Sequence, residues 1–173
     1  MGPDDPGHTS RIGLTRATAT AAELSLRAAL AATIAVAVAR LLDLPHPLYA
    51  LIAAVIVIDL VPKRTRELAG PRIAGTLLGA AGGALTAHFL PVNAWTFGLG
   101  IMGTMFVMHL MRVPDGARLA GYVCGIVLLD HRDNAWLYAL DRVIETVLGI
   151  TVAVGLSLLP SLIPDPESSE RRS

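Results

Sequence analysis

Six long apolar stretches alternate with short polar segments along the chain. The stretches are residues 24–42, 48–61, 73–90, 94–111, 117–129 and 143–159. None of them alternates between apolar and polar positions, as the strand of a membrane β-barrel would. Prolines fall between them, at Pro45, Pro47, Pro62, Pro71, Pro91, Pro114 and Pro160. Because proline interrupts regular helices, this pattern predicts an all-α chain of six helices.

The length and apolarity of these stretches favour a membrane as their solvent. A helix needs about 20 residues to cross the hydrocarbon core of a bilayer, and four of the stretches reach this length with their flanks. The second and fifth are shorter. A soluble helical bundle would need an amphipathic stripe on each helix, but residues 73–90 carry only Thr76, Thr86 and His88 as polar side chains. We therefore predict a polytopic membrane protein with six transmembrane helices and the lipid bilayer around it.

Composition agrees with this prediction and argues against several function classes. Apolar residues make up 53% of the chain, charged residues only 16%, and the mean hydropathy is +0.58, whereas soluble domains carry about 25% charged residues. The formal net charge is zero, so no nucleic-acid partner is expected. Cys124 is a single cysteine, and Lys63, the single lysine, lies outside any phosphate-binding loop. We expect no metal, no cofactor, no catalytic residues and no enzyme activity.

The distribution of arginine and lysine predicts how the chain is oriented. With a cytoplasmic N-terminus, the inner side holds 11 basic residues and the outer side 3. The inner set is Arg11, Arg16, Arg27, Lys63, Arg64, Arg66, Arg72, Arg112, Arg118, Arg171 and Arg172, and the outer set is Arg40, Arg132 and Arg142. Both termini should therefore face the cytoplasm, in the plasma (inner) membrane. The domain organisation expected is a disordered or amphipathic N-terminal tail (1–22), a six-helix membrane domain (23–163) and a polar C-terminal tail (164–173).

The two halves of the chain resemble each other at an offset of about 70 residues. The segment 72–79 (RIAGTLLG) aligns with 142–149 (RVIETVLG), and residues 58–59 align with 129–130. Upstream, Leu44-Pro45 matches Val113-Pro114. With three helices per half, the halves must be inverted with respect to each other, which is an arrangement found in secondary transporters. The two short helices occupy equivalent places, and such a pair is a pointer to a midplane binding site, although short helices can also merely thin the bilayer.

Three segments carry a resemblance to a known family. They are 44–50 (LPHPLYA), 72–84 beginning at Arg72, and 135–149 (AWLYALDRVIETVLG). Together they make the chain similar to the fusaric acid resistance (FUSC) or aromatic acid exporter family, over about residues 27–160. The resemblance implies a transporter of aromatic and other organic acids. Typical members have two such units or a large cytoplasmic domain, which implies that this single unit assembles as a homodimer or higher homo-oligomer.

A few ionisable residues within the apolar stretches are candidates for a substrate or ion pathway, because charge inside a membrane is costly. Arg142 and Glu145 fall on one helix face; Glu145 could bind a proton and Arg142 an organic carboxylate, or the two could form an interfacial ion pair. Asp59, Asp130 and Arg72 are further candidates; both aspartates lie at helix ends and could be solvated there.

Glycines at four-residue spacing are candidates for close helix packing. They are Gly75, Gly79, Gly83, Gly121 and Gly125, and such faces let helix backbones approach each other within or between subunits. Taken together, the sequence predicts a permease for small organic, possibly aromatic, acid anions. The alternative is a non-transporting scaffold or accessory subunit of a larger transporter.

Overall fold

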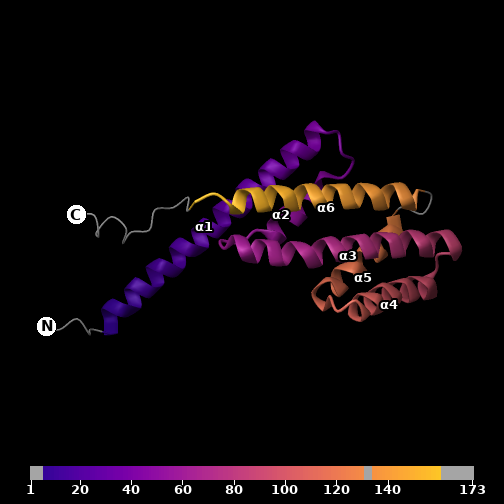
Figure 1. Cartoon of the computed structure of the whole chain (residues 1–173), viewed down its shortest axis with the longest axis horizontal. Helices are drawn as coiled ribbons and strands as arrows, with labels where there is room; N and C mark the ends of the chain where they lie inside the picture. Colours follow the sequence, from indigo (N-terminus) through magenta and orange to yellow (C-terminus); the bar gives the residue numbers. More distant parts are fainter. Residues whose placement is uncertain (1–5, 131–133, 161–173) are drawn as a thin grey trace.

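The computed structural model describes residues 6–130 and 134–160; the side chains of residues 6–17 and 130 lie outside the description. Within these residues every regular element is an α-helix (Figure 1). The helices are α1 (Pro6–Leu41), α2 (Pro47–Val57), α3 (Pro62–Phe89), α4 (Ala94–Leu110), α5 (Pro114–Asp130) and α6 (Ala135–Ser157). The predicted all-α class and its six helices are confirmed.

Several helix boundaries differ from the expectation. α1 begins at Pro6, so the N-terminal tail expected over residues 1–22 is helical wherever it is described. α3 and α6 start well before their apolar stretches, because the charged turns in front of them are helical as well. The C-terminal tail 164–173 lies outside the described residues.

Pro71 does not separate two helices, as the sequence suggested, but lies inside α3. A proline in a helix removes one backbone hydrogen bond and crowds the preceding turn. Buried residues flank it on both sides, Ala69 and Arg72, so packing of the surrounding turns holds the helix through this point.

The expectation of two equally short helices was wrong. α2 has 11 residues, whereas α5 has 17, the same as α4. α2 ends at Val57 because Ile58 adopts an extended backbone (φ −63°, ψ 133°). The following turn is closed by Asp59, whose backbone N–H donates to Thr65 Oγ1 at 3.0 Å and whose carboxylate accepts from the N–H of Val61 at 3.1 Å.

The turns after α1 and α4 have the same construction. Asp43 (φ 50°) and Arg112 (φ 61°) are left-handed residues, an uncommon conformation for residues other than glycine. In the first turn the N–H of Leu44 donates to the carbonyl of Ala39 at 2.9 Å; in the second, the N–H of Val113 donates to that of Met108 at 3.1 Å. This is the hydrogen bond of a Schellman helix end. Each turn is followed at once by a proline, Pro45 or Pro114.

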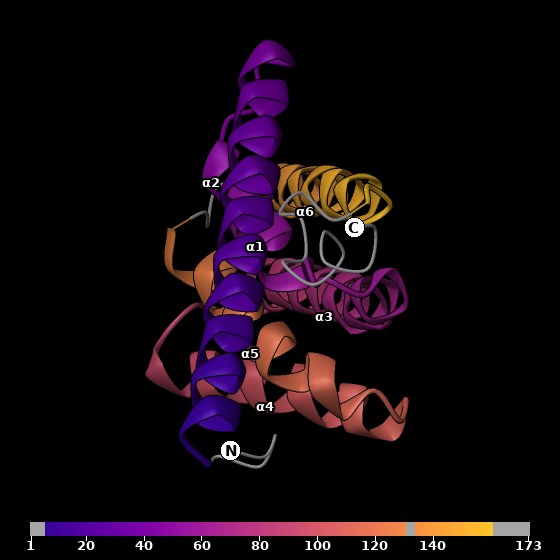
Figure 2. The same cartoon turned by 90° about the vertical axis from the view of Figure 1, so that its left-hand side faces the viewer.

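The helices form a bundle around an α3–α6 pair. α3 and α6 lie side by side along the long axis and run in opposite directions (Figure 1). α5 packs on α3 and α2 packs on α6. α1 contacts α2 and α6, while α4 contacts α5 and α3. The N-terminal part of α1 projects past the other helices (Figures 1 and 2).

Small residues form most of the interior, and large apolar residues face outward. The buried positions include Ala31, Ala35, Ala39, Ala50, Ala53, Ala54, Ala80, Ala84, Ala117, Ala120, Ala139 and Ala153. On α4 the buried residues are Gly100, Thr104 and Met108. Trp95 (89% exposed) and Phe106 (67% exposed) lie on its outer face.

One helical stretch of the described residues, Thr18–Leu41, is by length and composition able to cross a bilayer. Two other helices, Pro47–Val57 and Ala94–Leu110, are apolar but shorter. The charged residues at the start of α3 and within α5 and α6 lower the apolarity of those helices.

Candidate functional site: a buried arginine among aromatic rings

Arg142 lies at the centre of a polar cluster between α2 and α6. Its side chain is almost fully buried, at 2% exposure. The guanidinium carbon Cζ sits 3.2 Å from the centroid of the Tyr49 ring, which is a cation–π contact. The N–H groups at Nε and Nη1 are buried and have no hydrogen-bond partner. These two donors lie on different edges of the guanidinium, so each is available to an acceptor oxygen that fits beside it.

Aromatic rings from both helices surround this arginine. The hydroxyl of Tyr138 donates to the hydroxyl of Tyr49 at 2.6 Å. The ring of His46 lies edge-on to that of Tyr138, with centroids 5.2 Å apart, and near that of Tyr49, with centroids 5.8 Å apart. Tyr49 and Tyr138 are themselves edge-to-face at 6.2 Å. This arrangement fixes the Tyr49 face on which the arginine rests.

Glu145, one turn after Arg142, is completely buried. Its Oε1 accepts from the backbone N–H of His46 at 2.6 Å, and its Oε2 has no partner. The expected pairing of Arg142 with Glu145 along the helix is not observed: among the described residues, the ion pairs within 4.0 Å do not include these two. The reason is that α2 offers each side chain its own contact, an aromatic face for Arg142 and a backbone donor for Glu145.

Arg72 of α3 lies near this cluster. It is 7% exposed, its Nε has no partner, and it is close enough to act electrostatically on Arg142. Thr76, one turn later, is also buried, with an unpartnered hydroxyl. Two buried arginines with free donors thus come from the two central helices.

The two aspartate candidates lie elsewhere. Asp59 is in the α2–α3 turn, where its Oδ2 lies 3.4 Å from Nε of the exposed Arg64. Asp130 is the last residue of α5, and its side chain lies outside the described residues.

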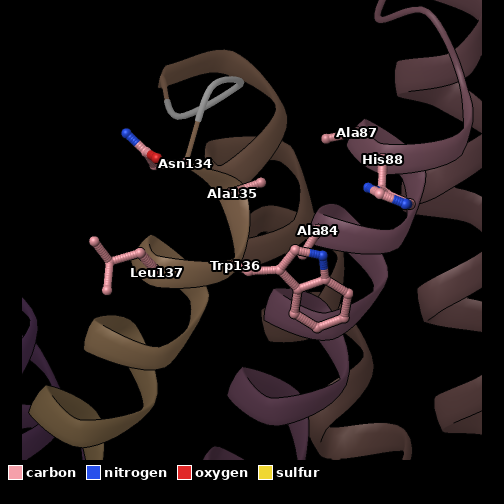
Figure 3. A pocket seen from close by; sticks show the side chains of 7 residues that line it. All are labelled: Ala84, Ala87, His88, Asn134, Ala135, Trp136 and Leu137. Atoms are coloured by element: carbon pink, nitrogen blue, oxygen red, sulfur yellow. The ribbon is translucent and has the colours of Figure 1, made fainter.

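A cavity of about 460 Å³ opens between the end of α3 and the start of α6. Its lining residues are Ala84, Ala87, His88, Asn134, Ala135, Trp136 and Leu137. Trp136 reaches from α6 toward Ala84 and His88 of α3 (Figure 3). Ala84 and Ala135 belong to the same packed cluster as Tyr138, against which Tyr49 also packs. The wall of the cavity is therefore continuous with the aromatic residues that cover Arg142.

The glycine candidates lie at helix contacts within the chain. A Cβ added to Gly79 would come within 2.5 Å of the carbonyl oxygen of Ala120, and one on Gly75 within 2.6 Å of that of Gly116. Gly83 faces Val127 in the same α3–α5 contact. Gly121 and Gly125 face side chains of α4 instead. A Cβ added to Gly121 would lie 3.0 Å from Met105, and one added to Gly125 would lie 3.5 Å from Phe97.

Sequence reasoning missed His46, Tyr49 and Tyr138 as site residues. All three occur in the segments that carry the family resemblance, LPHPLYA and AWLYALDR, but nothing local assigns them a role. Tyr49 and Tyr138 lie 89 positions apart, and only the packing of α2 on α6 brings them together. The one available signal was the pair Pro45 and Pro47, which flank His46 in the segment between α1 and α2.

Comparisons with known proteins agree with the resemblance. The family model described as aromatic acid exporter family member 1 matches residues 23–159, most of the chain. No curated protein and no solved structure matches this chain. An exporter family implies a membrane location and suggests a transport activity rather than an enzymatic one. The chain belongs to the aromatic acid exporter family.

Proposed function

We propose that this protein is a six-span permease that moves small organic acid anions across the plasma membrane. The observation that carries the proposal is the buried Arg142, whose N–H groups at Nε and Nη1 have no acceptor among the described residues. A buried cation whose donors have no hydrogen-bond partner is unfavourable in a low-dielectric interior. A carboxylate is the planar anion that an arginine fork binds best.

The distribution of side-chain sizes supports insertion of all six helices. In water, a single chain with so many exposed Leu, Ile, Phe and Trp side chains would present large apolar patches. In a bilayer the same residues are solvated by lipid, while glycine and alanine at the helix contacts let backbones approach closely. Both termini are then cytoplasmic, as the arginine distribution predicts.

The pattern of helix contacts supports a 3+3 inverted repeat. Exchanging α1, α2 and α3 with α4, α5 and α6 converts α3–α5 into α6–α2, α1–α2 into α4–α5, and α1–α6 into α4–α3, all of which are contacts of the bundle. Adding 70 to Gly79 and Ala50 gives Gly149 and Ala120, and the two close approaches are Gly79–Ala120 and Gly149–Ala50. Inverted repeats of this kind place substrate near the middle of the membrane, between the repeats.

The cavity beside Trp136 gives the anion a route to Arg142. It lies at the end of α3 and the start of α6, which the proposed orientation places on the outer side. A substrate leaving toward the outside would pass Tyr49 and Tyr138, whose hydroxyls are joined by a hydrogen bond of 2.6 Å. We propose that this tyrosine pair opens during transport and that a second copy of the chain completes the transporter.

The direct test is transport by the purified protein in proteoliposomes. A panel of aromatic, aliphatic and dicarboxylic acids is offered, and flux is compared between the wild type and Arg142→Gln. We expect flux of a subset of monocarboxylates that Arg142→Gln lowers at least about tenfold. Glu67→Gln, at an exposed pair with Lys63 on α3, is the matched control and should transport normally. A folded wild type that moves none of the acids would overturn the proposal in favour of a non-transporting accessory subunit.

A further inference from the structure

Glu145 differs from every other described carboxylate in its surroundings. It is 0% exposed, while the carboxylates of Glu23, Asp59 and Glu67 are at least partly accessible and lie within 4.0 Å of an arginine or lysine. Its Oε1 accepts a hydrogen bond from the backbone N–H of His46. Its other oxygen, Oε2, is buried without a donor. An ionised carboxylate in this position would leave half of its accepting capacity unused, which is costly in an interior.

The charged and titratable groups around Glu145 come from several helices. On α6 itself, Asp141 and Arg142 act on its charge. α2 contributes His46 and Tyr49. Through Arg142 the site also includes Arg72 of α3 and Tyr122 of α5. α1 reaches α6 through the apolar residues Ala31, Ala35 and Ala39.

This set of groups makes anion binding and proton binding depend on each other. With the site empty, the positive charge of Arg142 favours an ionised Glu145 one turn later on α6. When a substrate carboxylate takes the free donors of Arg142, it neutralises that positive charge. A second carboxylate one turn away would then be repelled, because like charges at close range cannot both stay ionised in a low dielectric.

We propose that Glu145 is a proton-binding site, and that the permease takes up one proton from water onto Glu145 for each monocarboxylate that it binds at Arg142. The proton goes to Oε2, the oxygen without a partner. The new O–H then offers the bound carboxylate a further donor in addition to those of Arg142. The inference rests on the proposed function and adds to it the coupling ion and its stoichiometry: anion and proton move together, without net charge.

Each chain has one such proton-binding site, because the first half has no acid at the corresponding position. The positions equivalent to Glu145 and His46, 70 residues away, are Gly75 and Gly116. In place of an acid on a backbone donor, these two glycines form a close backbone approach. Arg72 consequently has no acid one turn after it.

The test measures the proton directly. Benzoate is titrated into the full-length protein in lipid nanodiscs by calorimetry, in two buffers with different ionisation enthalpies, between about pH 6 and pH 8, where free benzoic acid is ionised. We expect uptake of up to one proton per benzoate, and affinity that weakens by about tenfold per pH unit where Glu145 is ionised in the empty site. Glu145→Gln, which imitates the neutral acid, should bind with no proton uptake and with affinity independent of pH.

The outcomes separate this inference from the proposed function. Glu67→Gln should keep the wild-type proton uptake, since Glu67 is exposed and pairs with Lys63 at the surface. Wild-type binding without proton uptake, or a folded Glu145→Gln that keeps the pH dependence, would overturn the inference and leave the anion site standing. Absence of binding by the wild type of every acid in the panel contradicts the anion site itself. If Glu145→Gln does not fold, the proton count on the wild type decides.

Discussion

The two halves of this protein share their packing but not their polar chemistry. α3 against α5 and α6 against α2 meet through equivalent glycines, and the turns after α1 and α4 use the same hydrogen bond and the same left-handed residue. Arg72 and Arg142 are both buried. Around Arg142, however, stand two tyrosines, a histidine and an acid, whereas the equivalents of Tyr49, Tyr138 and Glu145 are Leu119, Leu68 and Gly75.

This difference separates what builds the bundle from what acts in it. Packing is repeated because both halves must satisfy the same backbone geometry with small residues. The acid and the aromatic rings occur once, at the contact of α6 with α2, where they lie around a single anion site. A polar group kept in one half only is costly for the fold and is therefore better explained by function than by packing.

The largest effect expected concerns the inverted arrangement of the halves. Leu42 and Met111 are equivalent, exposed residues in the two matching turns. In an inverted repeat they face opposite sides of the membrane. With Cys124→Ala as background, Leu42→Cys should react completely with a membrane-impermeant maleimide added to intact cells, and Met111→Cys only after permeabilisation. Labelling of both from the same side would exclude the inverted repeat.

Next in size is the effect of filling the close helix contacts. Gly79→Leu and Gly149→Leu should each prevent accumulation of folded protein, because the added side chain meets the backbone of Ala120 or Ala50 and overpacking costs about 1–3 kcal/mol or more. Gly98→Leu is the matched control, since nothing lies within 4 Å of its Cβ position. Size-exclusion profiles and thermal unfolding in mild detergent measure the outcome. Equal profiles for Gly79→Leu and Gly98→Leu would refute the packing role.

Comparing the two arginines should give a smaller, functional effect. Arg142→Lys keeps the charge but replaces the planar fork with a point charge, so we expect about a tenfold loss of flux and weaker selectivity among anions. Arg72→Lys, at the position where Leu119, Leu68 and Gly75 replace the two tyrosines and the acid, should lose less. Flux ratios in proteoliposomes at matched protein content check this order. A larger loss at Arg72 would move the principal site to the first half.

The sequence predicted the six helices and the glycine contacts because both follow from local patterns. Apolar stretches and prolines locate the helices, and four-residue spacing places Gly75, Gly79 and Gly83 on one face. The starts of α3 and α6 were not predicted, since the charges in Pro62–Arg72 and at Asp141 and Arg142 interrupt the apolar pattern without ending the helices.

The site was predictable only in its α6 part. Arg142 and Glu145 share a helix face by spacing, but whether they pair with each other depends on what another helix offers. Here the contacts come from the ring of Tyr49 and the backbone N–H of His46. Both residues lie about 100 positions before Arg142 and Glu145 in the chain. No pattern within one helix contains that information.

The smallest effect expected concerns the pair of hydroxyls of Tyr49 and Tyr138 beside Arg142, which has no equivalent beside Arg72. Tyr138→Phe removes the donor of the 2.6 Å bond to Tyr49 but keeps the ring and its contact with His46. A hydrogen bond between neutral groups contributes about 0.5–1.5 kcal/mol, so the unfolding temperature should fall by a few degrees. Tyr122→Phe is the control, because Tyr122 is 42% exposed and its hydroxyl makes no hydrogen bond with the described residues.

If the pair closes the wall between the cavity and the arginine, Tyr138→Phe should also raise the rate of anion release. The equilibrium affinity should stay nearly unchanged, since Arg142 keeps its donors. A lower melting temperature with an unchanged release rate would leave the bond a purely stabilising contact and would place the route for the anion elsewhere in the bundle.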